Sequence, residues 1–522
     1  MIQIKLENKT RWKQASLGEH MLYFTGHLYQ DETLYTEETI QDYFENIEFS
    51  PEYNSKWTGN FAFIYQTPEY TFAACDRKRS IPLFYWKNGE NWIISDRILP
   101  QKAPLDETAV MEFLLTGYAA NEKTLYKNVC QIEAGQALLF EADSFEKHQY
   151  FRYYHSPEQI DLETASKQLE DVFHRVFKRL HERLKDKHVM IPLSGGYDSR
   201  IIALLLKEYG VQNISSFTYG RLENNEARKS KEIADKLGID WTFYEYSRND
   251  WKKWYESADW KQYADFGTNA SVMAHLQDWP AVSQLAKQAD TKYVFMPGHS
   301  GDFVAGSHLM YELTIDKEYT IDEVVERIMG KHHRLWETHD SSKSNVISEI
   351  KSSLAGLPYQ NREQASALFE YWDWKERQAK FIINSVRVYE YYDHEWEIPL
   401  WDDELMNFFL TIPVDLRFKK YLYDYTLHQM YPALFEKPVK KDMAATSLKQ
   451  KYGPLYSQLK KAYNKKRVLQ QYYKDPMEWY GIYGNYFAYL QNISFTHNRV
   501  RYSNPYNINS FLVKDYIHHL KG

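Results

Sequence analysis

The sequence predicts an α/β protein: a strand-rich N-terminal part, then a parallel sheet covered by helices on both faces, then a helical C-terminal extension. Two observations support this prediction. Short runs of β-branched and aromatic residues dominate the chain up to about residue 155. Beyond that point, strand-like runs alternate with amphipathic helical patterns, which is the order that builds a parallel sheet.

The strands of the N-terminal part are brief and lie between turn residues. Phe61–Tyr65 and Trp92–Ile94 have strand composition, and Lys87-Asn88-Gly89 has the composition of a turn. Gln136–Phe140, directly after Gly135, is expected to form another strand.

The first long helix is expected over Leu162–Leu184, where apolar residues recur at steps of three and four. The next expected elements alternate: strand His188–Leu193, helix Ser199–Tyr209, strand Ile214–Tyr219, helix Asn225–Leu237 and strands Trp241–Tyr246 and Lys292–Met296. Gly238 is a stop signal for the second of these helices. From about Phe369 onward the sequence is helical and aromatic, and the chain contains no internal repeat.

Composition and charge exclude several classes of protein. A chain of 522 residues is long enough for two or more domains with cores. Its net charge of −7 argues against binding to nucleic acid or a membrane surface, which needs a basic face. No apolar run is long enough to span a membrane, and Met1–Leu6 lacks a signal-peptide pattern, so we expect a cytoplasmic protein. Cys75 and Cys130 are too few for a disulfide scaffold or a zinc site.

The segment Pro192–Ser199 joins an expected strand to an expected helix and has the residue types of a phosphate-binding loop. Gly195 and Gly196 let the backbone approach a phosphate, and the following helix directs its N–H groups and positive dipole end at the anion. The serines at both ends of the loop add hydroxyl donors. Asp198 would repel a phosphate unless it holds a bridging Mg²⁺. A plain glycine turn is the alternative. Six consecutive positions, Ser194 to Ser199, have the residue types of a phosphate-binding loop and lie between a strand and a helix, which argues against a plain turn.

Ser194-Gly195-Gly196-Tyr197-Asp198-Ser199 resembles the SGGxDS signature of the ATP-pyrophosphatase (PP-loop) family, whose members release pyrophosphate from ATP and leave AMP on a substrate. The loop differs from a Walker A motif, which needs a Lys-Ser/Thr pair. The resemblance implies ATP and Mg²⁺ as cofactors. It implies nucleotide contacts from Leu193, Ser194, Gly195, Gly196, Asp198 and Ser199, with Asp198 also a metal ligand.

A second segment, Pro297–His308, also follows an expected strand and resembles the SGEGADELFGGY segment of asparagine synthetases. Gly298, Asp302 and Gly306 match that pattern. The resemblance implies that Gly298 lies at the nucleotide and that Asp302 is the second metal ligand, since two carboxylates at neighbouring strand ends can hold Mg²⁺.

His299 and Phe303 depart from this pattern. His299 stands where the family has a glutamate thought to deprotonate the incoming amine, and Phe303 replaces the second acidic residue. Because a histidine titrates near neutrality, His299 is a candidate general base, with a packing role equally open. A nucleophile elbow is excluded, because Asp302 stands where that motif needs glycine.

Further matches extend the resemblance along the chain. Phe217–Gly220 falls where the family places its adenine-contacting strand, which implies Thr218, Tyr219 and Gly220 at the nucleotide. Glu397–Leu405 resembles RVPFLDHEL, with Glu397 in place of the arginine. Lys440 and Lys441 lie where the family carries a lysine that stabilises the adenylate-forming transition state. The choice between these two lysines stays open, as does a solvated surface role for each.

Residues 59–97 resemble the glutaminase half of the same enzymes, with Gly59–Phe63 and Ala74–Arg77 as the clearest matches. An active glutaminase of this type uses a cysteine directly after the initiator methionine, and Ile2 stands there instead. We therefore expect a degenerate class II glutamine-amidotransferase-like domain with an N-terminal-nucleophile (Ntn) type α+β sandwich over residues 1–155. An asparagine-synthetase-like PP-loop ATP-pyrophosphatase domain with a Rossmann-like sheet is expected over 156–522. Cys75 is expected to be a small buried residue.

The resemblance implies a carbon–nitrogen ligase without glutaminase activity. It would adenylate a substrate carboxylate and transfer the acyl group to ammonia or an amine. Similarity to proteins associated with surface polysaccharides suggests a uronic acid; 44 tyrosines and 15 tryptophans fit sugar stacking, with core packing as the alternative. An intramolecular cyclase of β-lactam or lasso type and a non-catalytic ATP-binding scaffold are the alternatives. The expected partners are small molecules, without nucleic acid or membrane, and a homodimer or an ammonia-supplying partner is left open.

Overall fold

Two sheets form the N-terminal part of the computed structural model, which describes residues 2–8, 11–45, 56–98, 103–141, 145–288, 291–338, 340–439, 472–493, 496–497, 500–502 and 508–521. The smaller sheet has the strand order β1-β8-β7-β9 and the larger β11-β10-β6-β5-β3-β2, with β4 beside β3. The strands are β1 (Ile2–Lys5), β2 (Lys13–Leu17), β3 (His20–Gln30), β4 (Thr33–Tyr35), β5 (Trp57–Gln66), β6 (Thr71–Cys75), β7 (Phe84–Asn88), β8 (Asn91–Ser95), β9 (Val129–Gln131), β10 (Gln136–Phe140) and β11 (Phe145–Gln149).

These two sheets pack face to face. Tyr85 of β7 and Phe140 of β10 meet between them, with ring centroids 6.2 Å apart. The outer face of the larger sheet is covered by helix α1 (Ile40–Phe44), whose Phe44 ring lies 4.9 Å from that of Phe63. Both faces of β5 are therefore buried, which explains its continuous apolar sequence.

A parallel sheet follows, with the order β14-β13-β12-β15-β17. Its strands are β12 (His188–Pro192), β13 (Ile214–Gly220), β14 (Asp240–Glu245), β15 (Tyr293–Phe295) and β17 (Glu395–Trp396). The predicted mixed α/β fold class is confirmed. The short edge strand β17 was missed, because two residues carry no periodicity that could identify them.

Helices cover both faces of this sheet. One face carries α5 (Tyr197–Glu208) and α6 (Asn225–Leu237). The hydroxyl of Thr218 in β13 makes a 2.7 Å hydrogen bond to that of Ser230 in α6. On the other face, the ring of Phe295 stacks 4.1 Å from that of Tyr389 in α14 (Arg387–Tyr391). The predicted helix over 162–184 is α4 (Leu162–Arg183), and it is capped by Asp161, whose carboxylate accepts from the backbone N–H of Thr164.

The remaining helices complete the chain. They are α3 (Glu107–Thr116), α7 (Arg248–Glu256), α8 (Ala258–Thr268), α9 (Trp279–Gln288), α10 (Gly301–Val304), α11 (Ile321–His332), α12 (Asp340–Ser353), α13 (Arg362–Trp372), α15 (Asp403–Leu410), α16 (Val414–Arg417), α17 (Tyr421–Met430), α20 (Tyr486–Ile493) and α21 (Ile508–Lys521). A π-helical segment, η2 (Asp373–Ile382), continues α13 and leads through the 3₁₀ turn η3 (Ile383–Val386) to α14. A small sheet joins β16 (Trp336–Thr338), β18 (Thr496–His497) and β19 (Val500–Tyr502). Among the described residues, no helix is both long and apolar enough to cross a membrane.

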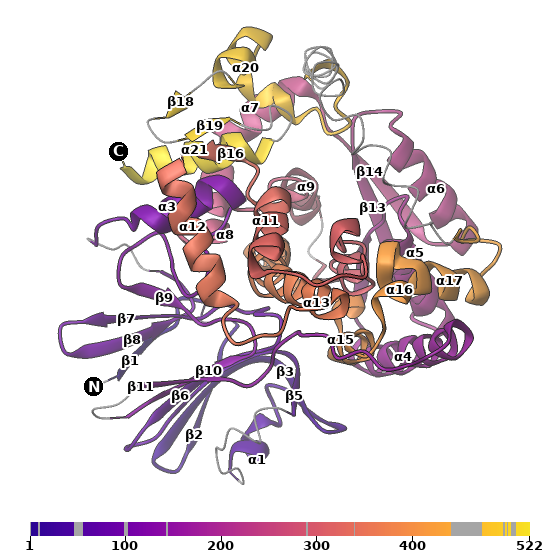
Figure 1. Cartoon of the computed structure of the whole chain (residues 1–522). Coiled ribbons are helices and arrows are strands. Elements are labelled where there is room, and N and C mark those ends of the chain that lie inside the picture. Colours follow the sequence, from indigo (N-terminus) through magenta and orange to yellow (C-terminus); the bar gives the residue numbers. More distant parts are fainter. Residues whose placement is uncertain are drawn as a thin grey trace.

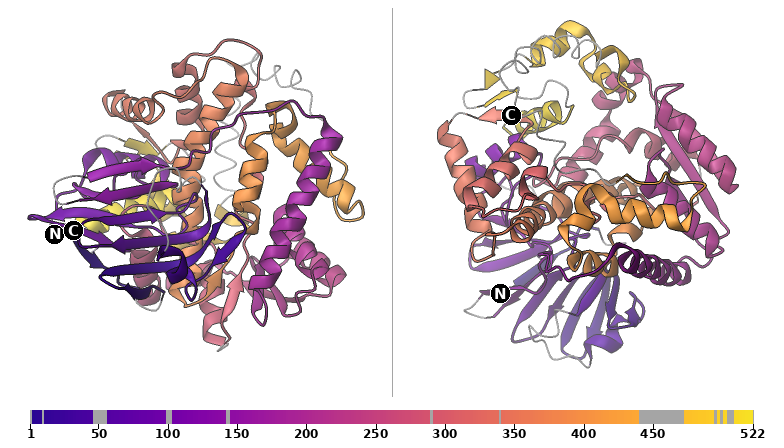
Figure 2. Two further views of the ribbon diagram at one scale, coloured as in Figure 1. Left: turned by 90° about the horizontal axis from the view of Figure 1, so that it is seen from below. Right: turned by 45° about the vertical axis from the view of Figure 1, so that its right-hand side comes forward.

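The N-terminal sheets lie at one end of the molecule, and strands β13 and β14 lie toward the other (Figure 1). Two further views keep the N-terminal sheets together on one side of the chain (Figure 2). Residues 150–161 contain neither helix nor strand, and the proposed domain boundary after residue 155 falls among them.

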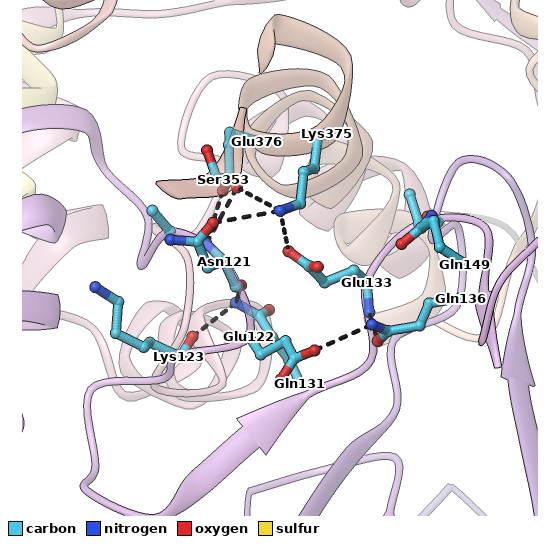
Figure 3. Close-up of polar contacts among 12 residues, drawn as sticks. Asn121, Glu122, Lys123, Gln131, Glu133, Gln136, Gln149, Ser353, Lys375 and Glu376 are labelled. Atoms are coloured by element: carbon cyan, nitrogen blue, oxygen red, sulfur yellow. Dashed lines mark hydrogen bonds and ion pairs between the residues drawn. The ribbon is translucent and has the colours of Figure 1, made fainter. Parts of the chain in front are cut away.

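Buried polar contacts join the two parts. Lys78 pairs with Asp403 at 2.8 Å, with both side chains almost fully buried. In a second group, Lys375 of η2 lies 3.0 Å from Glu133, and the neighbouring Glu376 accepts from the backbone N–H of Asn121 (Figure 3). The segment η2 thus contacts the N-terminal part directly.

Candidate active site

The loop between β12 and α5 is held by its own serines. The backbone N–H of Ser194 donates to the Ser199 hydroxyl at 3.0 Å, and that of Gly196 donates to the Ser194 hydroxyl at 3.1 Å. Gly196 is the N-cap of α5 and gives no side-chain cap, so the first N–H groups of the helix face the loop. The helix begins at Tyr197, two residues before the predicted start. This geometry can bind an anion such as a phosphate.

Gly195 lies against α6. A Cβ at this position would stand 2.9 Å from Cδ of Lys229, so a larger residue would push the helix away. The backbone N–H of Gly195 donates to the Glu226 carboxylate at 2.9 Å. One of the N–H groups expected to face a phosphate therefore already has an anionic partner from the protein.

The second predicted segment lies directly against this loop. A Cβ on Gly298 would stand 2.9 Å from Cβ of Asp198 and 3.1 Å from the backbone nitrogen of Ser199. Only glycine permits that approach without a shift of the backbone. The two loops follow β12 and β15, which are adjacent parallel strands, so their carboxyl ends meet at one edge of the sheet.

Two carboxylates converge where these loops meet. Burial raises the pKa of Asp198 to about 6; Lys420 opposes the shift, and the neighbouring charge of Asp302 adds to it. Asp302 is partly exposed and accepts from the Ser307 hydroxyl at 2.9 Å. Mg²⁺ is usually bound by one or two carboxylates together with phosphate oxygens, so Asp198 and Asp302 are the residues that could hold it. In the part of the chain that is described, no group of three or more His, Cys, Asp or Glu residues is arranged to hold a metal ion.

His299 belongs to the second loop and is half-buried. Its Nε2 lies 2.6 Å from the hydroxyl oxygen of Ser385, which also lies 2.7 Å from the Ile382 carbonyl oxygen. Burial lowers the pKa of His299 to about 4, against the opposing charge of Asp278. The imidazole is therefore neutral at pH 7 and can accept a proton, but a pKa this far below neutrality makes it a weaker base than an ordinary histidine.

Asp278, which the sequence did not single out, interacts electrostatically with His299. It accepts hydrogen bonds from the hydroxyl groups of Tyr219 and Tyr389, the latter at 3.0 Å, and lies 3.4 Å from Nε2 of His275. Burial favours its neutral form, yet the hydrogen bond and charge of His275 bring the pKa of Asp278 down to about 2. The charge of this buried carboxylate opposes the lowering of the pKa of His299. A lone aspartate before a helix gives no sequence signal for such a role.

The predicted adenine-side residues Thr218 and Tyr219 are engaged within the protein. The hydroxyl of Thr218 donates to the Leu193 carbonyl and lies 2.7 Å from that of Ser230. The hydroxyl of Tyr219 donates a hydrogen bond to the carboxylate of Asp278. Gly220 adopts a positive φ of 127° next to the carbonyl oxygen of Pro476. These residues shape the strand end next to the loop, and their predicted contact with a nucleotide stays a prediction.

Lys420 joins the site from a part of the chain far away in sequence. Lys419 and Lys420 both adopt left-handed backbone conformations, with φ of 58° and 62°. Two such residues in a row are costly for lysine, and this strain is typical of functional sites. The turn places the ammonium of Lys420 5.5 Å from the centroid of the Tyr197 ring and 3.4 Å from the carboxylate of Asp424, and its charge opposes the rise in the pKa of Asp198. In the sequence, the run Lys420–Tyr423 resembles the lysine-plus-KYxLR region of asparagine synthetases.

The two lysines predicted at the transition state, Lys440 and Lys441, lie outside the described residues. Glu397, which stands in place of an arginine, pairs with Arg183 at 3.1 Å. Phe303, which replaces an acidic residue, is fully buried against Tyr153.

The N-terminal part offers no activated thiol among its two cysteines. Cys75 is fully buried, and burial raises its pKa to about 12. Burial also raises the pKa of Cys130. A nucleophilic cysteine needs a lowered pKa and access to solvent, so neither thiol suits that role.

Family models match two separate parts of the chain. The family model described as asparagine synthase matches residues 170–477, and that described as glutamine amidotransferase domain matches residues 18–151. A protein of Methanocaldococcus jannaschii named "Putative asparagine synthetase (glutamine-hydrolyzing) 2" is 22% identical over 271 residues. The match spans 50% of this chain and 51% of that protein, about half the length of the curated relative.

Two solved structures are similar to parts of the chain. The "structure of the allosteric regulatory enzyme of purine biosynthesis" is 12% identical, with 54% of this chain and 70% of that one covered and a TM-score of 0.18. The glutamine phosphoribosylpyrophosphate amidotransferase from B. subtilis is 10% identical, with 54% and 62% covered and the same TM-score of 0.18. At that TM-score the likeness carries no argument about fold or function.

Proposed function

Because this chain belongs to the asparagine synthase family, we propose that it is an ATP-dependent ligase that adenylates a carboxylate and converts it into an amide. The observation that carries the proposal is the meeting of two loops at one edge of the parallel sheet. One supplies the N-terminus of α5 and Asp198, and the other supplies His299 and Asp302.

The proposed reaction has two steps. The substrate carboxylate attacks the α-phosphate of ATP, and pyrophosphate leaves from the N–H groups of the Ser194–Ser199 loop. A nitrogen nucleophile then attacks the acyl carbon, AMP leaves, and His299 takes the proton released from the nitrogen. Mg²⁺, when bound by Asp198 and Asp302, would neutralise charge on the departing pyrophosphate. Lys420 adds a positive charge beside the same group, an electrostatic role also proposed for Lys440 or Lys441.

We further propose that the nitrogen comes from ammonia or an amine and not from glutamine. Both cysteines of the chain have raised pKa values, and Cys75 is fully buried. The N-terminal domain, proposed to span residues 1–155, then serves as a structural partner of the synthetase domain, proposed to span residues 156–522. A uronic acid is the first substrate acid to test, although many of the largest aromatic side chains, such as Trp57, Trp251 and Trp374, are buried in the core and not free to stack on sugars.

Pyrophosphate exchange tests the proposal. The protein is incubated with Mg-ATP, labelled pyrophosphate and a panel of uronates, amino acids and peptides, and label entering ATP is counted. Exchange that depends on one acid and disappears in Asp198→Asn supports adenylation; exchange that is preserved in Asp198→Asn contradicts the site.

Absence of exchange over the whole panel favours a second candidate, a non-catalytic ATP-binding scaffold. The bond from Gly195 to Glu226 is the observation that favours this second candidate, because it engages a phosphate-facing group. Product masses then separate an amide from a cyclised substrate.

A further inference from the structure

The π-helical segment η2 places residues five apart on the same face. At its end, the backbone N–H of Ile383 bonds the carbonyl of Gln378, five residues earlier, as in a π-helix. In an α-helix, two residues five apart would point about 140° away from each other. In η2, the side-chain amide of Gln378 instead donates to the Asp373 carboxylate at 3.1 Å. Lys375 and Lys380 form a second pair with the same spacing, so η2 presents two distinct faces.

One face of η2 is bound to the N-terminal part. Lys375 lies 3.0 Å from the Glu133 carboxylate, and Lys380 donates to the backbone carbonyl of Asn121 at 2.6 Å. Glu376, between the two lysines, accepts from the backbone N–H of Asn121 (Figure 3). All three η2 side chains are buried, so removing one partner would leave a buried charge unpaired.

The other face of η2 holds the second loop of the proposed site, residues 297–308, near both of its ends. The hydroxyl of Ser300 donates to the side-chain oxygen of Gln378 at 2.9 Å. Nδ1 of His308 lies 2.6 Å from the Asp373 carboxylate. Ser300, Gln378 and Asp373 are buried, so these bonds are protected from competition with water.

Ser300 is strained and directly follows the proposed base. Its φ of 60° is left-handed, a conformation that a non-glycine residue keeps only where its surroundings hold it. The bond to Gln378 is such a restraint. The imidazole of His299 is held in turn by the hydroxyl of Ser385 in η3, which directly follows η2. One continuous helical segment therefore fixes both the backbone beside His299 and its side chain.

We propose that η2 positions His299 for the amide-forming step, with Gln378 and Asp373 as positioning residues, and that the N-terminal part holds η2 in place through Glu133 and Asn121. This inference rests on the proposed function for the chemistry of His299. The N-terminal part then contributes to the ligase reaction through contacts with η2 and not through hydrolysis of glutamine.

Hydrogen–deuterium exchange of the full-length protein, followed in peptides that cover residues 297–308, tests the link without any substrate. Lys375→Met and Gln378→Leu should each raise the exchange rate of this loop about tenfold or more, because each frees one face of η2. Lys375→Arg keeps the charge that pairs with Glu133 and should restore slow exchange.

Lys123→Met is the matched control. It removes a lysine from the same neighbourhood, but the acidic partners of that lysine, Glu112 and Glu349, belong to α3 and α12. The loop should exchange at the wild-type rate in this variant, and an equal rise would mean that the whole interface loosens, which overturns the link. An unchanged rate in both Lys375→Met and Glu133→Gln also overturns it. Circular dichroism checks folding, and Glu133→Gln decides if Lys375→Met does not fold.

The two half-reactions test the positioning role. With an acid that supports pyrophosphate exchange, Gln378→Leu should slow single-turnover amide formation about tenfold to a hundredfold and keep pyrophosphate exchange within about twofold, because only the second step uses His299. Lys375→Met should show the same split, and Lys375→Arg should restore the amide rate. Equal losses in both half-reactions, or an unchanged amide rate with a loosened loop, overturn the positioning role. If no acid supports pyrophosphate exchange, the proposed function alone is contradicted, and deuterium exchange of the loop still decides the link between η2 and the N-terminal part.

Discussion

The backbone N–H of Gly195 donates a 2.9 Å hydrogen bond to the carboxylate of Glu226. In the proposed site this N–H faces the pyrophosphate of ATP, so the carboxylate and the nucleotide compete for one donor. Glu226 is exposed on the first turn of α6, and can rotate away when a phosphate arrives.

Replacing Glu226 should therefore tighten ATP binding. Glu226→Ala removes both the competing acceptor and its negative charge, and we expect the dissociation constant of ATP to fall about threefold to tenfold. Equilibrium binding of a fluorescent ATP analogue measures the change. Glu232→Ala on the same helix is the matched control, and weaker binding in Glu226→Ala would show instead that this carboxylate assists the nucleotide.

Asp198 should be required for activity while lowering the stability of the folded protein at pH 7. Its pKa is raised to about 6, so the folded state binds a proton more readily than the unfolded state. Its contribution to stability is therefore largest below about pH 4 and is lost as pH rises through 6. Asp198→Asn should raise the free energy of unfolding at pH 7 by about 1–3 kcal/mol while abolishing pyrophosphate exchange. Urea unfolding at pH 4 and pH 7 checks the sign: the gain should be present at pH 7 and small at pH 4. Asp235→Asn, on the surface of α6, should change neither stability nor exchange.

His299 should act in the second step alone. His299→Gln is expected to slow amide formation by about 10²–10⁴ and to leave acid-dependent pyrophosphate exchange intact. Because the pKa of His299 is lowered to about 4, the wild-type rate of amide formation should fall only as pH drops toward 4, not near 6.5. Single-turnover rates from pH 4 to 8 provide the measurement. Equal losses in both half-reactions would assign His299 to packing.

Ser385 should position that imidazole. Its hydroxyl lies 2.6 Å from Nε2 of His299, and its removal leaves the ring free to turn. Ser385→Ala should shift the acid limb of the pH profile and lower the rate, and Ser385→Thr, which keeps the hydroxyl, should restore both. A profile that keeps its position in Ser385→Ala would contradict this role.

The contact between Lys78 and Asp403 should hold the N-terminal sheets against the rest of the chain. Both side chains are almost fully buried, and Asp403 also accepts from the backbone N–H of Gly59 at 2.7 Å. Lys78→Met leaves a buried carboxylate unpaired and should cost about 3–5 kcal/mol of stability. Denaturant unfolding measures it, and the double variant Lys78→Met/Asp403→Leu should recover part of the loss. A loss below about 1 kcal/mol in the single variant would mean that water or a neighbour compensates the charge.

Cys75 should be dispensable for amide formation. Cys75→Ala is expected to leave the rate with ammonia unchanged, and glutamine should not replace ammonia in either protein, because burial raises the pKa of this thiol to about 12. Glutamate release from glutamine is the measurement. Turnover of glutamine by the wild type would show that the N-terminal domain is an active amidotransferase.

The sequence alone determined the mixed α/β fold class, the long helix at 162–183 and most strands of the parallel sheet. It did so because apolar periodicity and glycine turns are local properties of the chain. It also identified Ser194–Ser199 and Gly298–Asp302 as two candidate loops, since each keeps its residue types in one short segment. Their predicted roles stay predictions.

Only the tertiary structure determined which residues from other segments surround those loops. Glu226, Asp278 and Ser385 reach the site from separate helices and turns, and each carries a common residue type with no local pattern. Burial, charge coupling and unpaired donors arise from packing between segments, and local sequence patterns do not contain them.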